Sequence, residues 1–162
     1  MTLSGFEIYT DFVKSLVDAE ASRKSSIESK GISVITTSGT LVTLLFGLVA
    51  VVTSHSSFTL PVAAHGWLVA AVLAFVVAAA LAILVSFPLP YGQTDLTVNL
   101  LRDWWGDSES VADAAVVQLR LDQLAAARRM NVLKVTVLCL ASGAELVGLI
   151  MLTVAVIRIV GA

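Results

Sequence analysis

Three long apolar segments, separated by polar ones, dominate the pattern of this chain. They cover residues 32–53, 67–87 and 132–160. Only the third contains charged residues, which are Lys134, Glu145 and Arg158. A helix of about 20 apolar residues crosses the roughly 30 Å hydrocarbon layer of a membrane, and backbone groups in lipid must be satisfied within the segment. The pattern therefore predicts an all-α integral membrane protein with three transmembrane helices.

The polar segments before the first and third spans have the periodicity of amphipathic helices. Before the first span, apolar residues recur at steps of three and four, at Phe6, Tyr9, Val13 and Leu16. A similar seam precedes the third span, and no proline interrupts either transition into the membrane. We therefore expect cytoplasmic helices over 5–31 and 109–131 that continue into the first and third spans and form a helical stalk.

Two connectors complete the predicted single domain. The first, residues 54–66, contains no lysine or arginine and is predicted as an outer loop. The second begins at Pro88, a proline that ends the helix of the second span. Trp104 and Trp105 favour the headgroup zone, so we predict a cytoplasmic interfacial amphipathic segment over 88–108. The alternative is that the tryptophan pair plugs a helix junction.

Composition supports a membrane protein. Of the 162 residues, 57% are hydrophobic and 14% are charged, whereas ordinary soluble domains contain roughly 25% charged residues. The formal net charge of −2 gives no electrostatic reason to expect nucleic acid as a partner. The expected partner is the lipid bilayer.

Lysine and arginine are distributed unevenly around the three spans. Nine of the ten lie before the first span, or between the second span and the first residues of the third; the exception is Arg158. Cytoplasmic segments of membrane proteins carry the excess of these residues. The distribution predicts a multi-pass protein with its N-terminus in the cytoplasm and its C-terminus outside, where Arg158 reaches the outer headgroups.

The first span carries a stripe of small and hydroxyl side chains along one helical face. Its members follow steps of four and three: Thr36, Thr40, Thr43, Gly47 and Ala50. The second span has an alanine stripe that includes Ala74 and Ala78, and the third has Ala141, Gly148 and Ala155. Spans associate in lipid through small residues and hydroxyl hydrogen bonds. We therefore expect a homo-oligomer built around the first span, or alternatively a monomer whose stripes pack against one another.

The hydroxyls of the first span have two interpretations. Around a central axis, they would line a narrow and weakly polar pore. Alternatively, each threonine bonds the carbonyl four residues earlier in its own helix and has no further role.

Glu145 lies near the middle of the third span. An ionised carboxylate there costs roughly 2.5–3.5 kcal/mol or more, so the group is either neutral or satisfied by a partner. The donors available in the sequence are Thr36, Thr40 and Thr43 of the first span, and Ser142 nearby. We predict an intramembrane polar site that consists of Glu145, Thr36, Thr40 and Thr43. It serves either as a structural link between helices or as a proton or cation site.

Charged residues of opposite sign lie at matching distances before the first and third spans. Counting back from each predicted membrane edge pairs Glu20 with Arg120, and Glu28 with Arg128 or Arg129. We predict that these pairs set the register of the stalk, while apolar seams hold it together, because exposed pairs contribute only about 0–1 kcal/mol. The alternative is that each charge is solvated or pairs within its own helix.

No pattern of a catalytic or metal site is visible. His55 and His65 flank the outer connector without a carboxylate or thiol beside them, and Cys139 lies within an apolar run. The sequence contains no phosphate-binding glycine loop and no nucleophile triad. We expect neither an enzyme nor a bound cofactor or metal.

Two charged helical segments that lead directly into spans carry a family resemblance. They are EASRKSSIESKG, residues 20–31, and QLRLDQLAAARRMNVLKVTVLCLASG, residues 118–143. In the order of these parts, the chain resembles the small transmembrane effectors of bacterial cyclic-pyrimidine (Pycsar-type) anti-phage systems and their relatives. The resemblance implies a bacterial inner-membrane protein that assembles and damages the membrane after a nucleotide signal. The chain departs from this pattern because it has no separate nucleotide-binding domain, so no binding residues carry over.

These features lead to one expected function and two alternatives. The leading expectation is a homo-oligomeric inner-membrane effector or channel-like assembly built around the stripe of the first span. The first alternative is a non-conducting scaffold that binds a cytoplasmic protein through the stalk. The second is a proton-linked transport subunit that uses Glu145.

Overall fold

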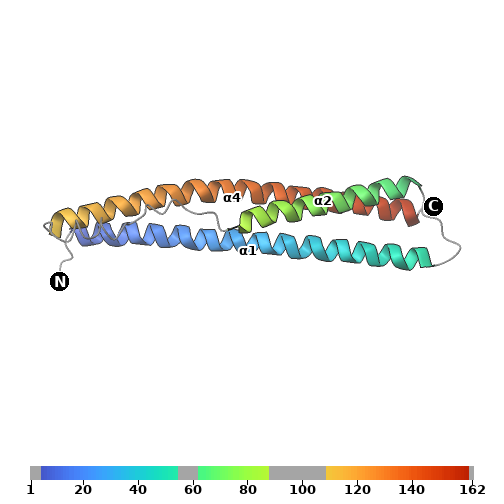
Figure 1. Ribbon diagram of the computed structural model, residues 1–162, viewed down its shortest axis with the longest axis horizontal. Coiled ribbons are helices and arrows are strands. Elements are labelled where there is room, and N and C mark those ends of the chain that lie inside the picture. The colour runs from blue at the N-terminus through green and yellow to red at the C-terminus, as the bar shows by residue number, and fades with distance from the viewer. Residues whose placement is uncertain (1–4, 55–61, 88–108, 161–162) are drawn as a thin grey trace. The chain divides into compact units, whose positions relative to one another are not determined.

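A computed structural model of the chain describes residues 5–54, 62–87 and 109–160. This part is all-helical and consists of α1 (Gly5–Ser54), α2 (Val62–Ser86) and α4 (Glu109–Val160) (Figure 1). Each of the three helices contains a stretch long and apolar enough to cross a membrane. By length and composition, the chain is therefore a multi-pass membrane protein, and the part that the structure describes is all-helical. The predicted interfacial segment 88–108, with its tryptophan pair, and His55 lie outside the described residues.

Helices α1 and α4 are unusually long, at 50 and 52 residues. Each continues without a break from a charged segment into an apolar one, as expected from the sequence. Neither helix contains a proline, the residue that most often breaks a helix interior. The cytoplasmic location of their charged parts stays a prediction.

Helix α2 begins earlier than predicted. It starts at Val62 rather than at residue 67, so the last part of the predicted outer loop is helical. His65 therefore lies in a helix and not in a loop. The predicted boundary followed the apolar stretch, but helical hydrogen bonding does not depend on the hydrocarbon layer and continues beyond it.

Contacts divide the chain into two units. In the described part, the two-helix unit consists of residues 5–26 of α1 and 109–134 of α4. The three-helix unit consists of residues 27–54 of α1, residues 62–87 with α2, and residues 135–160 of α4.

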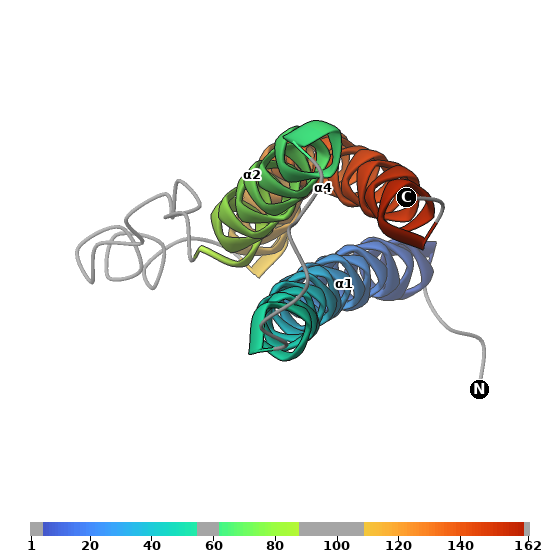
Figure 2. The same ribbon diagram turned by 90° about the vertical axis from the view of Figure 1, so that its right-hand side faces the viewer.

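In the three-helix unit, α2 packs against α1 and α4 through one continuous face, and Figure 2 shows α2 beside α4. The buried residues of α2 recur at steps of four and three: Ala64, Leu68, Ala71, Phe75, Ala78, Ala82 and Val85. The buried positions of α4 include three small residues at seven-residue steps, Ala141, Gly148 and Ala155. This is the spacing of coiled-coil packing, with small residues that let helices approach closely.

In the two-helix unit, α1 and α4 also pack through a seven-residue pattern. Val117, Leu124 and Asn131 are buried on α4, and Val13 and Glu20 are buried on α1. The side-chain amide of Asn131 donates a hydrogen bond to the backbone carbonyl of Glu20 at 3.1 Å. A single buried asparagine in such a seam specifies the register of the helices. Asn131 therefore aligns α1 with α4 in this unit.

This register contradicts the predicted pair of Glu20 with Arg120. Glu20 lies level with Asn131, so Arg120 is eleven residues away along α4, a distance of about 16 Å at 1.5 Å per residue. The carboxylate of Glu20 instead lies 3.7 Å from the guanidinium of Arg23 in its own helix. The prediction assumed that the two spans enter the membrane at matching residues, whereas side-chain packing and Asn131 set the observed alignment.

Candidate functional site

Glu145 lies at the seam between helices α4 and α1 in the three-helix unit. Its side chain is half-buried. Its Oε1 atom accepts hydrogen bonds from the hydroxyls of Thr37 and Ser38, the second at 3.4 Å. Ser38 is buried at this seam. The carboxyl group of Glu145 is therefore joined to α1 through two adjacent residues.

Thr37 and Ser38 are not the donors predicted from the sequence. The three predicted threonines donate within α1, Thr36 to the carbonyl of Ile32 at 3.0 Å, Thr40 to that of Thr36 at 2.8 Å and Thr43 to that of Gly39 at 2.9 Å. A threonine inside a helix readily reaches the carbonyl four residues earlier, and Thr37 does so as well, at 3.0 Å from the carbonyl of Ser33. Thr37 differs from the other three because it also contacts Glu145. Ser142 is exposed. The prediction took the donors from the stripe with the most regular spacing, whereas Glu145 contacts Thr37 and Ser38 on the neighbouring side of α1.

An open hollow of about 480 Å³ lies beside Glu145. Six residues line it, Thr36, Thr37, Thr40 and Leu41 from α1 and Glu145 and Leu149 from α4. Thr36 and Thr40 of the predicted polar site thus lie in the wall next to the carboxyl group, while Thr43 is not among the lining residues. The hollow offers one carboxyl group and several hydroxyl oxygens to a small polar ligand.

The small-residue stripe of α1 is exposed on the protomer, and of its members only Thr36 and Thr40 border the hollow beside Glu145. Its five members are all exposed: Thr36, Thr40, Thr43, Gly47 and Ala50. The buried face of α1 carries Val34, Ser38 and Leu45, which lie roughly opposite the stripe around the helix. A Cβ atom added at Gly39 or Gly47 would meet nothing within 4 Å. Helix α1 therefore packs onto α2 and α4 through its other face and leaves the stripe uncovered.

The small residues of α2 and α4, by contrast, are used inside the three-helix unit. Ala78 and Gly148 are buried and Ala74 is half-buried. A Cβ atom on Gly148 would lie only 2.9–3.1 Å from the ring of Phe75. A monomer in which all three stripes pack against one another is therefore not what the structure has, because the stripe of α1 takes no part in this packing.

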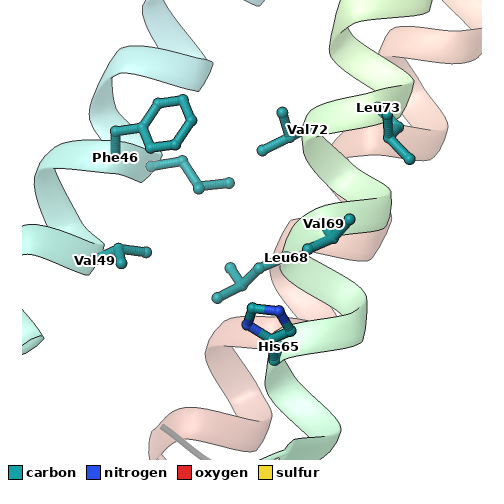
Figure 3. Close-up of a pocket in the computed structure, with 8 residues that line it drawn as sticks. Phe46, Val49, His65, Leu68, Val69, Val72 and Leu73 are labelled. Atoms are coloured by element: carbon teal, nitrogen blue, oxygen red, sulfur yellow. The ribbon is translucent and has the colours of Figure 1, made fainter.

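A second groove, of about 270 Å³, lies between α1 and α2 in the same unit (Figure 3). Its lining consists of Leu45, Phe46, Val49, His65, Leu68, Val69, Val72 and Leu73. Phe46 and Val49 of α1 face the α2 side chains across the groove (Figure 3). Its walls are apolar apart from His65, so the groove offers no pair of groups for acid–base chemistry.

The remaining charged candidates fall in both units. Arg120 is half-buried, and Arg128 and Arg129 are exposed, in the two-helix unit, whereas Glu28 belongs to the three-helix unit. The pairing of Glu28 with either arginine stays a prediction. Within each unit, the hydrogen bonds between α1 and α4 join residues 107 to 111 positions apart, rather than the 100 positions assumed for the charge pairs.

Neither a metal-binding group in the described residues nor a similar known protein adds to the chemistry of the Glu145 site. In residues 5–54, 62–87 and 109–160, no group of three histidine, cysteine, aspartate or glutamate side chains could hold a metal ion. Cys139 is exposed. No protein-family model, no curated protein and no solved structure matches the chain. The chemistry of the site therefore rests on Glu145 and the hydroxyls around it.

Proposed function

We propose that the chain is the protomer of a homo-oligomeric, channel-like membrane assembly whose copies meet along the stripe of helix α1. The observation that carries this proposal is the exposure of the whole stripe on the protomer. Hydroxyls and glycines that face lipid tails do not stabilise the protein, whereas between helices they allow close approach and hydrogen bonds. The stripe of a second copy is a surface that can pack against this stripe.

The length of the stripe supports this arrangement. Thr36 and Ala50 are fourteen residues apart, which is about 21 Å of helix and most of the roughly 30 Å hydrocarbon layer. In a closed ring, every copy meets its two neighbours through the same pair of surfaces, so all copies turn the same face of α1 towards the axis. The threonine hydroxyls already donate to carbonyls of α1, so they present their remaining lone pairs as acceptors. A path lined in this way favours cations over anions.

The location proposed for the assembly is the plasma membrane of a bacterium. The uneven distribution of lysine and arginine supports a cytoplasmic N-terminus and an extracytoplasmic C-terminus. The resemblance to transmembrane effectors supports a role in which assembly permeabilises the membrane. In that role, the charged parts of α1 and α4 are the cytoplasmic stalk.

Disulfide crosslinking in native membrane vesicles tests the interface. In a Cys139→Ala background, Thr40→Cys is expected to crosslink between copies, and Leu146→Cys is not. Leu146 is the matched control. It is 59% exposed on α4, and it lies close to the level of Thr40, because its neighbour Glu145 contacts Ser38, two residues before Thr40. Crosslinking through Leu146→Cys alone, or through neither residue, would overturn the interface.

Ion flux through the purified protein in liposomes tests conduction. Thr40→Leu adds bulk to the proposed lining and is expected to abolish most of the cation flux, whereas Thr40→Ser keeps a hydroxyl and retains it. An oligomer that conducts under no condition would favour a scaffold. A detergent-solubilised particle with the mass of a single protomer would contradict the proposed homo-oligomer.

A non-conducting scaffold is the second candidate function. Tyr9 and Phe12 of the two-helix unit are 47% and 59% exposed, and aromatic side chains are enriched at protein contact sites. In this case, a cytoplasmic protein binds the stalk there. Replacing both aromatic residues by alanine is then expected to abolish the protein's cellular effect without changing its oligomeric state.

A further inference from the structure

We infer that Glu145, Thr37 and Ser38 form a proton-binding site in the membrane-crossing part of the protein. All three residues belong to one protomer and to one unit. The site therefore does not depend on the proposed homo-oligomer. Three features support it. Glu145 has no charged group packed around it, the Thr37 hydroxyl can either donate to or accept from the carboxyl group, and an open hollow lies beside Glu145.

The groups packed around Glu145 carry no charge. From α1, the side chains facing it are those of Thr36, Thr37, Ser38, Thr40 and Leu41. On α4, Ala141, Gly148 and Leu149 lie three or four residues away, on the same side of the helix. Helix α2 contains one titratable residue, His65, which lines the other groove. Among the described residues around it, nothing supplies a positive charge to balance an ionised carboxylate.

The nearest charges along the two helices are distant. Lys30 precedes Thr37 by seven residues, and Lys134 precedes Glu145 by eleven. These separations correspond to about 10 and 16 Å along a helix. An ionised carboxylate near mid-membrane is costly, so the positive charge that balances Glu145 has to come from solution. A proton is the simplest source.

Thr37 has one hydroxyl proton and three acceptors within reach. Its Oγ1 atom lies 3.0 Å from the carbonyl of Ser33 and 3.2 Å from that of Val34, and it also contacts Oε1 of Glu145. When Glu145 is ionised, the Thr37 hydroxyl donates a hydrogen bond to the carboxylate. When Glu145 binds a proton, the new carboxyl O–H donates a hydrogen bond to Thr37 Oγ1, and the Thr37 hydroxyl donates to the backbone carbonyl of Ser33 instead. A hydroxyl can both donate and accept, so the two states need no movement of heavy atoms.

The hollow beside Glu145 connects the carboxyl group with the surface of the protomer. Thr36 and Thr40 add hydroxyl groups to its wall, which suits water and proton transfer. Calcium takes six to eight oxygen ligands, more than one carboxyl group and a few hydroxyls provide. A proton requires only one carboxyl oxygen, and the hydroxyls stabilise either protonation state.

Carbodiimide labelling of the full-length protein in liposomes tests this site, because the reagent modifies protonated carboxyl groups in apolar surroundings. Mass spectrometry of the peptide that contains Glu145 measures the labelled fraction at several pH values. Labelling is expected to be high at acidic pH and to fall as the pH rises, with no label in Glu145→Gln. Replacing choline by sodium or potassium at constant ionic strength is expected to change nothing.

Two substitutions of Thr37 test its part in the site. Thr37→Val removes the donor to the ionised carboxylate, so the labelled fraction of Glu145 at neutral pH is expected to rise. Thr37→Ser keeps the hydroxyl and is expected to leave the labelled fraction unchanged. Equal changes in both variants would exclude a specific role for the hydroxyl.

Three results would overturn the proton site itself. Equal labelling at every pH would mean a permanently neutral acid that only links two helices. Protection by sodium or potassium would mean an alkali-cation site, and no labelling of the unchanged protein would mean a carboxyl group that never binds a proton. If crosslinking through Thr40→Cys fails while the labelling follows pH as expected, the homo-oligomer is wrong and the proton site stands.

Discussion

Gly148 of helix α4 faces the ring of Phe75 on α2, and both residues are buried. A Cβ atom on Gly148 would lie 2.9–3.1 Å from three ring atoms, whereas carbon atoms pack best at about 3.5–4.0 Å. Phe75 is fully buried, so its ring has little room to move. One missing methyl group therefore decides how closely α2 and α4 approach.

Gly148→Ala is expected to lower the free energy of unfolding by about 1–3 kcal/mol, the usual effect of overpacking a core. Gly143→Ala on the same helix is the matched control, because a Cβ atom there meets nothing within 4 Å. Denaturant titration in mixed micelles measures both variants. Equal losses in the two would contradict the role of Phe75, and adding Phe75→Leu to Gly148→Ala is expected to restore part of the loss.

At the scale of the helices, polar contacts align α1 with α4. Asn131 bonds the backbone of Glu20 in the two-helix unit, and Glu145 bonds Thr37 and Ser38 in the three-helix unit. Within each unit the two helices run in the same direction (Figure 1), and the bonded residues have similar offsets in sequence. An apolar seven-residue seam by itself tolerates a slip of one repeat more easily than a seam with a specific polar contact does.

Asn131→Val is expected to raise the free energy of unfolding by about 1 kcal/mol, because it removes a buried amide whose Oδ1 atom has no hydrogen-bond partner. Asn131→Asp places a second carboxylate near the buried Glu20 and is expected to lower stability by about 3 kcal/mol. Thermal unfolding of the full chain in detergent compares the two. A loss of stability in Asn131→Val would show that its hydrogen bond to Glu20 outweighs the unpaired oxygen.

At the scale of the whole molecule, the exposed surface of the three-helix unit is of two kinds. Leu44, Leu73 and Ile157 are 60–64% exposed, as expected of side chains that face lipid tails. The stripe of α1 is equally uncovered but consists of hydroxyls, a glycine and an alanine. Lipid suits the first kind of surface, whereas the second suits contact with another helix.

The orientation of the whole chain is tested by labelling two serines of α1 that are both exposed, Ser15 and Ser54. In a Cys139→Ala background, an impermeant thiol reagent is expected to label Ser54→Cys in right-side-out vesicles and Ser15→Cys in inside-out vesicles. The reason is the excess of lysine and arginine before the first span. Labelling of Ser15→Cys in right-side-out vesicles would reverse the proposed orientation.

The helices of this protein were largely predictable, because each depends on residues that are close in the sequence. Helix α4 follows from an apolar stretch long enough to span the membrane and from the absence of proline after Glu109. The start of α2 was missed by five residues, since hydropathy marks the part of a helix that suits lipid and not the point where hydrogen bonding begins. The family resemblance stays a prediction.

The partners of Glu145 could not be predicted in the same way. Thr36, Thr37 and Ser38 are consecutive, and each residue turns by about 100° around the helix, so a small rotation of α1 changes which hydroxyl meets the carboxyl group. The sequence by itself determined the three long apolar helices of the described residues, the continuity of the first and third, and the presence of an acidic group in the third span. Only the tertiary structure decided which face of α1 is buried and which residues meet across α1 and α4. The physical reason is that rotation and register depend on packing between segments more than a hundred residues apart, such as Ser38 and Glu145.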